Sequence, residues 1–189
     1  IFSPALAFIH FGLQLLVWIM VVTGFFMGVF GGREYLEFPV WINAIVLFSW
    51  LCFMINFFAT VRPVFKNAPV YIWSFSTGLL FFFITMTEAQ LWVLPYFNNN
   101  IIRDVTVQWK AMGSMVGSWN MLVYGSAMLI MEKISGDKEM NHSKMAYFFY
   151  FLGMTNLMFN WGHHTYIVPA SPVEHQIGHA QEIKEVGHF

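Results

Sequence analysis

Two adjacent histidines, His163 and His164, are the side chains of this sequence best suited to bind a metal. They lie in the stretch 160–166, which reads NWGHHTY and follows a long apolar run. Neutral imidazole is a good ligand for copper, iron and zinc. The pair fits a metal site, and it equally fits two interfacial side chains that hydrogen-bond to backbone carbonyls or lipid headgroups at a helix end.

A second group of polar residues, GREYLE at 32–37, carries the carboxylates of Glu34 and Glu37. Residues three apart share a face of a helical turn, and carboxylates at a membrane surface can bind a hard cation such as Ca²⁺. The alternative interpretation is a solvated loop with a local pair between Arg33 and Glu37.

Two further positions carry polar chemistry inside apolar surroundings. Glu88 stands near the end of an apolar segment, where an ionisable group indicates a proton pathway or a buried partner. Because Pro95 follows soon after it, Glu88 could instead reach interfacial water. His10 and Gln14 are four residues apart on one helix face, and this spacing favours an interhelical hydrogen-bond pair over metal ligation.

Composition places these residues in a membrane. The chain has 189 residues, of which 58% are hydrophobic and only 10% are charged, whereas soluble domains carry about 25% charged residues. The net charge of −1 and the absence of a basic stripe argue against a nucleic-acid partner. The single cysteine, Cys52, excludes both an internal disulfide framework and a CxxCH haem attachment.

Five apolar segments are each long enough to cross a bilayer, which takes about 20 residues. They do not alternate as barrel strands do, so we expect an all-α bundle of five transmembrane helices within residues 1–168. The sequence shows neither a basic region nor a small-residue cleavage site at its start, so we expect no signal peptide. A polar tail follows at 169–189, in which His175 and His179 could share a zinc-binding helix face or simply be solvated. The segments are 5–30, 40–61, 70–94, 112–131 and 145–168.

Lysines and arginines between the segments favour one orientation. Five of them fall on one side of the expected bundle and four on the other, so the first side is expected to be cytoplasmic. His163, His164 and the stretch 32–34 then lie on the outer side. The five are Arg62, Lys66, Lys133, Lys138 and Lys144; the four are Arg33, Arg103, Lys110 and Lys184.

These motifs together resemble the large subunit of the haem-copper oxidase superfamily, in particular nitric oxide reductases and cbb3-type oxidases. GREYLE at 32–37, followed by Pro39, looks like that branch's GRE[FY]xE motif, and GHHTY at 162–166 is similar to its GHHxY motif. Between them, GSWN at 117–120 and SGDKE at 135–139 fall where the family has a G-x-W-E helix and a G-x-D-x-E turn. The five segments would correspond to the third to seventh helices of that longer subunit.

The resemblance implies a role for each motif. Glu34 would be a ligand of a Ca²⁺ that bridges haem propionates, and Glu37 would lie near the entry for protons from the outer side. His163 and His164 would hold non-haem iron or copper opposite a haem b. Implied partners are other membrane subunits, including a cytochrome c-type subunit, in a bacterial inner membrane.

The sequence departs from the family's pattern at several positions. Met112 or Gly113 stands where the family has its third metal histidine, and Val116 and Asn120 replace carboxylates of the reductases. Leu157 stands where the cbb3 branch has a tyrosine, and the family's haem ligands fall outside this chain. The resemblance therefore implies oxidoreductase activity only together with other chains.

Three functions follow as hypotheses. The chain is a non-catalytic membrane subunit of a respiratory or electron-transfer complex, or one piece of a split haem-containing oxygen or nitric oxide reductase. The third hypothesis is a small transporter or proton channel built around Glu88, His10 and the asparagines. Bound haem and metal would distinguish the second, and a continuous polar path without a cofactor would distinguish the third.

Overall fold

The computed structural model describes residues 1–165, and these residues form helices with no extended strand among them. The expected all-helical fold is confirmed for this part of the chain. Its contacts divide it into two compact units, Ile1–Lys66 and the part that begins at Asn67. The two units are described separately below. The predicted tail at 169–189 and the expected helix end at 166–168 lie outside the described residues.

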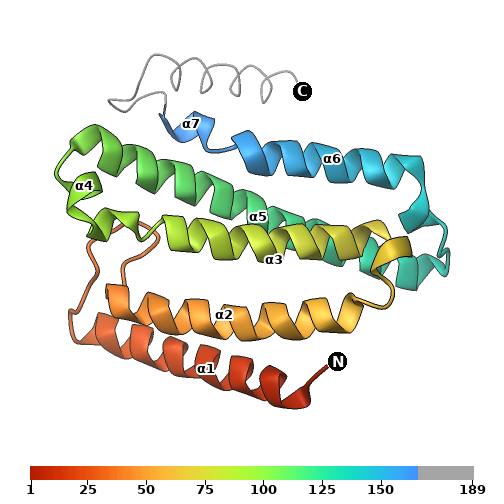
Figure 1. Ribbon diagram of the computed structural model, residues 1–189, viewed down its shortest axis with the longest axis horizontal. Coiled ribbons are helices and arrows are strands. Elements are labelled where there is room, and N and C mark those ends of the chain that lie inside the picture. The colour runs from red at the N-terminus through yellow and green to blue at the C-terminus, as the bar shows by residue number, and fades with distance from the viewer. Residues whose placement is uncertain (166–189) are drawn as a thin grey trace. The chain divides into compact units, whose positions relative to one another are not determined.

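The first unit is a pair of antiparallel helices, α1 (Pro4–Phe26) and α2 (Val40–Val61), which lie side by side (Figure 1). The Ser3 side chain accepts a hydrogen bond from the N–H of Leu6, and Pro4 occupies the first helical position, which is a favourable helix start. Asn56 then ties this start to α2. Its amide donates to the Ser3 carbonyl at 3.0 Å, and its Oδ1 accepts the Ser3 N–H at 2.8 Å.

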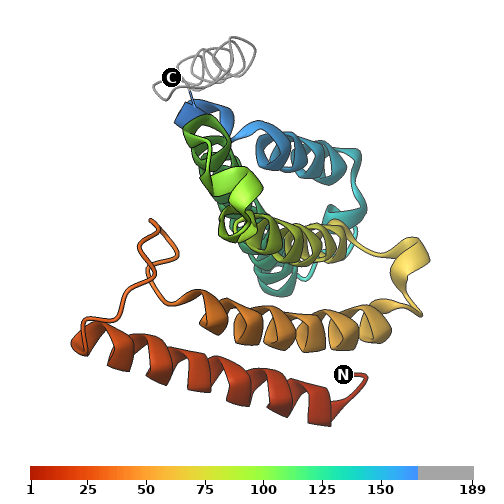
Figure 2. The same ribbon diagram turned by 60° about the vertical axis from the view of Figure 1, so that its left-hand side comes forward.

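Three long helices make up most of the second unit: α3 (Val70–Glu88), α5 (Ile101–Ser135) and α6 (Lys144–Phe159). α5 packs against both α3 and α6, and this arrangement is visible in both views (Figures 1 and 2). Short helices connect or follow them: η1 (Phe65–Asn67, at the boundary of the units), η2 (Leu91–Val93), α4 (Pro95–Asn98), η3 (Met140–His142) and α7 (Gly162–Thr165).

Small residues allow α5 to approach its neighbours closely. A Cβ atom added at Gly117 would lie 2.5 Å from the Cα of Leu157 in α6, and one at Gly78 of α3 would lie 2.9 Å from the carbonyl oxygen of Ser118. Helices in membranes associate through such contacts, because lipid supplies no hydrophobic driving force between them. The backbone of α5 therefore lies close to that of α3 on one face and to that of α6 on another.

Helix ends differ from several predicted boundaries for local reasons. α2 matches its predicted range. α5 begins at Ile101 instead of 112, because Asn100 accepts the N–H of Arg103 and extends the helix through polar residues. α3 ends at Glu88 instead of 94 because the chain continues as η2, and α1 ends at Phe26 before Gly28, whose φ is 69°.

The expectation of one continuous helix over 145–168 is wrong. α6 ends at Phe159, a turn follows at Asn160 and Trp161, and α7 begins at Gly162. The turn coincides with the closest contact between this segment and α5, since a Cβ at Gly113 would lie 2.7 Å from the Cβ of Trp161. Packing of Trp161 against α5 thus separates the histidine pair from α6.

Among the described residues, three helical stretches are long and apolar enough to cross a bilayer: Pro4–Phe26, Val40–Val61 and Val70–Val93. The chain is accordingly a membrane protein. α5 and α6 do not reach the same standard. α5 carries serines, glycines and Asn120 among its apolar residues, and α6 has 16 residues where a span takes about 20.

Candidate functional site

The histidine pair lies on α7, directly after the turn that ends α6. The His164 N–H donates to the Trp161 carbonyl at 3.1 Å, and the Trp161 indole N–H donates to the Met158 carbonyl at 2.9 Å. These bonds fix the backbone that carries the imidazoles. The two rings have centroids 4.0 Å apart and are tilted by 39°, so the side chains lie next to each other on the same part of the molecule.

α5 forms the wall beside this pair. The indole of Trp109 stacks on the His164 ring, with centroids 5.2 Å apart and planes 12° apart. One turn further along α5, Gly113 faces Trp161 so closely that no side chain would fit there. Met112 is buried, at 3% exposure. Trp109 was not among the predicted site residues; its four-residue spacing from Gly113 was the only sequence signal that could have placed it on the same face.

The surroundings of His164 favour the neutral imidazole. Burial lowers the pKa of His164, because removal of water penalises the charged form, and the neighbouring His163 lowers the pKa further by charge repulsion. Neutral imidazole is the form that can ligate a metal or accept a hydrogen bond.

Within residues 1–165 the donor set is too small for the implied iron or copper centre. Nowhere in the described part of the chain do three or more His, Cys, Asp or Glu side chains gather closely enough to hold a metal ion. The contacts of α5 with this segment include the Trp109 indole on His164 and Gly113 against Trp161, whereas the family's site has a third imidazole from this helix.

The carboxylates of Glu34 and Glu37 lie on a tight loop, and the predicted shared helical face does not form. The N–H of Gly31 donates to the Glu37 carbonyl, and the N–H of Leu36 donates to the Arg33 carbonyl at 3.0 Å. An isolated β-bridge joins the latter two residues. A loop replaces the turn because glycine permits it: Gly32 has a φ of 79°, and a Cβ at Gly31 would lie 2.7 Å from the Leu36 oxygen.

Within this loop the two carboxylates have different surroundings. Oε1 of Glu37 accepts the N–H of Tyr35 at 3.0 Å, and Tyr35 itself has a φ of 63°, so the Glu37 side chain stabilises an uncommon backbone conformation. Glu34 is exposed. Both belong to the first unit, whereas the histidine pair belongs to the second. The calcium and proton-entry roles of these residues stay predictions.

Glu88 has a partner that the sequence interpretation did not name. Lys110 of α5 places its Nζ 2.6 Å and 2.8 Å from the two carboxylate oxygens, and the side chains are 24% (Glu88) and 37% (Lys110) exposed. The sequence feature that could have identified this partner is its opposite charge, because Lys110 is the sole lysine between Lys66 and Lys133. The ion pair gives Glu88 a charge partner, and its partial exposure also agrees with the alternative that it reaches interfacial water. The proton-pathway role stays a prediction.

The predicted interhelical hydrogen bonds of His10 and Gln14 are confirmed, and their common partner is Ser49 of α2. Nδ1 of His10 lies 2.9 Å from the Ser49 hydroxyl and 3.0 Å from its carbonyl oxygen, and Gln14 Nε2 donates to the same hydroxyl at 3.2 Å. The His10 ring also stacks on Phe53 at 4.8 Å. These contacts explain both polar residues as part of the α1–α2 packing.

The structure thus stacks Trp109 on His164, places Gly113 against Trp161 just before the histidine pair, and pairs Glu88 with Lys110. The remainder of the GHHTY motif, Tyr166, lies outside the described residues. Comparison with known proteins adds no further assignment, because the chain matches no family model, no curated protein and no solved structure.

Proposed function

We propose that this chain is a non-catalytic membrane subunit of an electron-transfer complex, related to the large subunit of the haem-copper oxidases and carrying an incomplete metal cage. In this proposal α5 and α6 also cross the bilayer, as the fourth and fifth spans, and the uncovered apolar faces contact lipid and other subunits.

The observation that carries the proposal is the contact between α5 and α7. The resemblance expects the third metal histidine at Met112 or Gly113, and Gly113 is the residue of α5 that packs against Trp161, two residues before His163. Trp109, one turn earlier, stacks on His164. The expected cage position and the histidine pair are thus neighbours, while the residues at that position carry no imidazole.

Residue exposure supports the two additional spans. The stretches 112–131 of α5 and 145–159 of α6 contain no charged side chain. Large apolar side chains on them face outward, including Val123 at 62%, Ile130 at 56% and Phe151 at 59% exposure. Such side chains are costly in water and favourable in hydrocarbon. A proton channel is less well supported, because Glu88 is neutralised by Lys110 and His10 is engaged by Ser49.

A metal and haem assay on the full chain purified from membranes tests the proposal. We expect neither stoichiometric haem nor stoichiometric iron or copper, and no change in the double variant His163→Ala/His164→Ala. One iron or copper per chain that is lost in the double variant would show a complete centre and would overturn the proposal in favour of a working enzyme.

A gain-of-ligand variant tests the proposed relationship itself. Met112→His should restore the third imidazole, so that the chain binds one Zn²⁺, used as a redox-inert probe, in a manner that requires His163 and His164. Met115→His, which places an imidazole at another buried position of α5, is the matched control and should bind none. Failure of Met112→His to gain zinc, in a folded protein, would argue against the cage geometry.

A further inference from the structure

A cavity of about 400 Å³ opens between α3, α5 and α6, away from the histidine pair. One row of its lining residues runs along α5 from Met121 to Met131, and a second row runs along α6 from Phe149 to Asn156. Ten residues of helix correspond to a length of about 15 Å. The cavity is therefore elongated along the helix axes, a shape that suits a chain better than a compact molecule.

One of the buried polar atoms that line this cavity, the Ser74 hydroxyl oxygen, lacks a partner. Ser74 of α3 is 1% exposed, and its hydroxyl has no hydrogen-bond partner in the structure. A buried hydroxyl without a partner is unfavourable, and more so where no water can reach it. The Tyr150 hydroxyl, by contrast, is already bonded to Thr77 Oγ1 at 2.8 Å, which holds its ring in the cavity wall. Ser74 thus offers a donor to whatever occupies the cavity.

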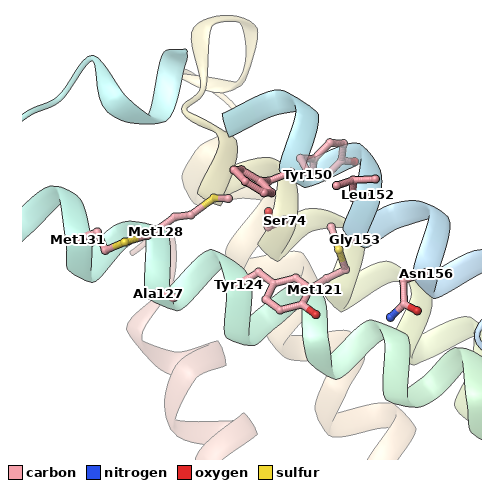
Figure 3. Close-up of a pocket in the computed structure, with 11 residues that line it drawn as sticks. Ser74, Met121, Tyr124, Ala127, Met128, Met131, Tyr150, Leu152, Gly153 and Asn156 are labelled. Carbon is pink, nitrogen blue, oxygen red and sulfur yellow. The ribbon is translucent and has the colours of Figure 1, made fainter. Parts of the chain in front are cut away.

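The lining changes in polarity along its length. Figure 3 shows Met131 and Met128 at one end, Asn156 at the other, and Ser74 between them. The end near Asn156 also carries the Tyr124 hydroxyl, whereas the methionine end presents only apolar groups and flexible thioethers, which adapt readily to irregular apolar ligands. This gradient matches an amphiphile with a polar end near Asn156 and an apolar chain toward Met131.

The lining also selects against charge. No Lys, Arg, Asp or Glu contributes to it, so the phosphate of a phospholipid would lie here without a counter-charge. An ester carbonyl would accept a hydrogen bond from Ser74, and a free alcohol would bond to the Asn156 amide.

We infer that this cavity binds an uncharged acyl ester lipid of the monoacylglycerol type, with its ester carbonyl at Ser74, its glycerol hydroxyls at Asn156 and its acyl chain along Met128 and Met131. The inference goes beyond the proposed function and does not depend on it, because it requires only α3, α5 and α6.

Photolabelling of the full-length chain in detergent tests this site. The probe is a monoacylglycerol with a diazirine at the end of its acyl chain, and the labelled peptides are identified by mass spectrometry. We expect labelling of the segment around Met128 and Met131 that saturates and is displaced by unlabelled monoacylglycerol. Labelling spread over the exposed faces of α1 and α2 would indicate bulk lipid contact and would overturn the inference.

Two substitutions on α3 distinguish the loss of the Ser74 hydroxyl from the general effect of removing a buried serine hydroxyl. Ser74→Ala should weaken binding about five-fold, which is the typical worth of one hydrogen bond. Ser76→Ala is the matched control, because Ser76 is also buried and its hydroxyl donates to the Ile72 carbonyl of its own helix at 2.7 Å. Equal binding by the Ser74→Ala variant and the unmodified chain would contradict the assigned ester contact.

A second set of variants fills the cavity with larger side chains. Gly153→Leu should abolish labelling. If that variant does not fold, Ala127→Phe replaces it in the experiment and should have the same effect, because position 127 lines the cavity, is exposed and tolerates bulk. Competition then identifies the ligand class. An anionic phosphatidylglycerol should fail to displace the probe, and so should an alkane of equal length. Stronger displacement by a prenylquinone, or by either of these two competitors, would overturn the assignment to an uncharged ester.

Discussion

At the scale of single residues, the Glu88–Lys110 pair combines two charges at the contact of α3 with α5. Both side chains keep some contact with solvent, which screens the two charges, so the contribution of the pair to stability is small. Glu88 is the last residue of α3, and Lys110 reaches it from within α5, so each charge has a partner of opposite sign. The pair therefore helps to fix the position of α3 along α5.

A double-mutant cycle measures this contribution. Lys110→Met, Glu88→Gln and the double variant should show a coupling free energy of about 1 kcal/mol, because each single change leaves the other group without its charged partner. The measurement is unfolding of the purified chain in detergent. Additive single effects would mean that the ion pair contributes nothing to stability.

His164 gives a pH-dependent prediction. Its pKa in the folded chain lies below the ordinary value of 6.5, so acidification protonates the unfolded chain first. The stability that the α5–α7 contact contributes is thus complete above about pH 6.5 and declines as the pH falls through that value toward the lowered pKa. Hydrogen exchange of the His164 N–H, measured against pH, reports this decline.

The variant Trp109→Leu tests whether burial by the Trp109 indole lowers the pKa of His164. Loss of the stacked indole should let water reach the imidazole and raise the His164 pKa toward its ordinary value, as followed by NMR titration. Trp119→Leu is the control, because Trp119 lies on the same helix but has a different ring neighbour, Phe82. An unchanged His164 pKa in the Trp109 variant would show that other groups bury the ring.

At the scale of elements, the packing of α5 against α6 depends on glycine. Gly117→Ala places a Cβ 2.5 Å from the Leu157 Cα, and a backbone atom cannot yield as a side chain can. We expect destabilisation by about 2 kcal/mol. Gly12→Ala in α1 is the matched control: a Cβ at Gly12 meets nothing within 4 Å, so alanine there should be neutral or should stabilise the helix by about 0.5 kcal/mol.

At the scale of the whole molecule, the path of α5 decides the number of membrane crossings. Three helices meet the length and hydropathy that a crossing needs, and α5, at 35 residues or about 52 Å, is longer than a bilayer core of about 30 Å. α5 therefore either crosses with an extension into water or lies along the surface, and these alternatives put Asp137 on opposite sides of the membrane.

Cysteine accessibility distinguishes these alternatives. In a Cys52→Ser background, Glu34→Cys and Lys66→Cys should react with an impermeant maleimide from opposite sides of sealed vesicles, because α2 lies between them. Asn99→Cys should react from the side of Glu34→Cys. If α5 crosses, Asp137→Cys reacts from the side of Lys66→Cys; if it reacts from the side of Asn99→Cys, α5 does not cross.

Several features were predictable from the sequence because they depend on neighbouring residues alone. The starts of α2 at Val40 and α3 at Val70 follow from Pro39 and Pro69 and from the length of the apolar runs. In lipid the backbone must satisfy its own hydrogen bonds, so a long apolar segment has few alternatives to a helix. For the same reason the membrane character and the helical class followed from composition and segment length.

Only the tertiary structure decided which side chains meet. The stacking of Trp109 on His164, the pairing of Glu88 with Lys110 and the sharing of Ser49 by His10 and Gln14 each join residues of different helices. Successive residues rotate by about 100° around a helix, so the partner of a side chain depends on how each helix is turned toward its neighbour. That rotation is set by close contacts such as those of Gly113 and Gly117, which the local sequence does not encode.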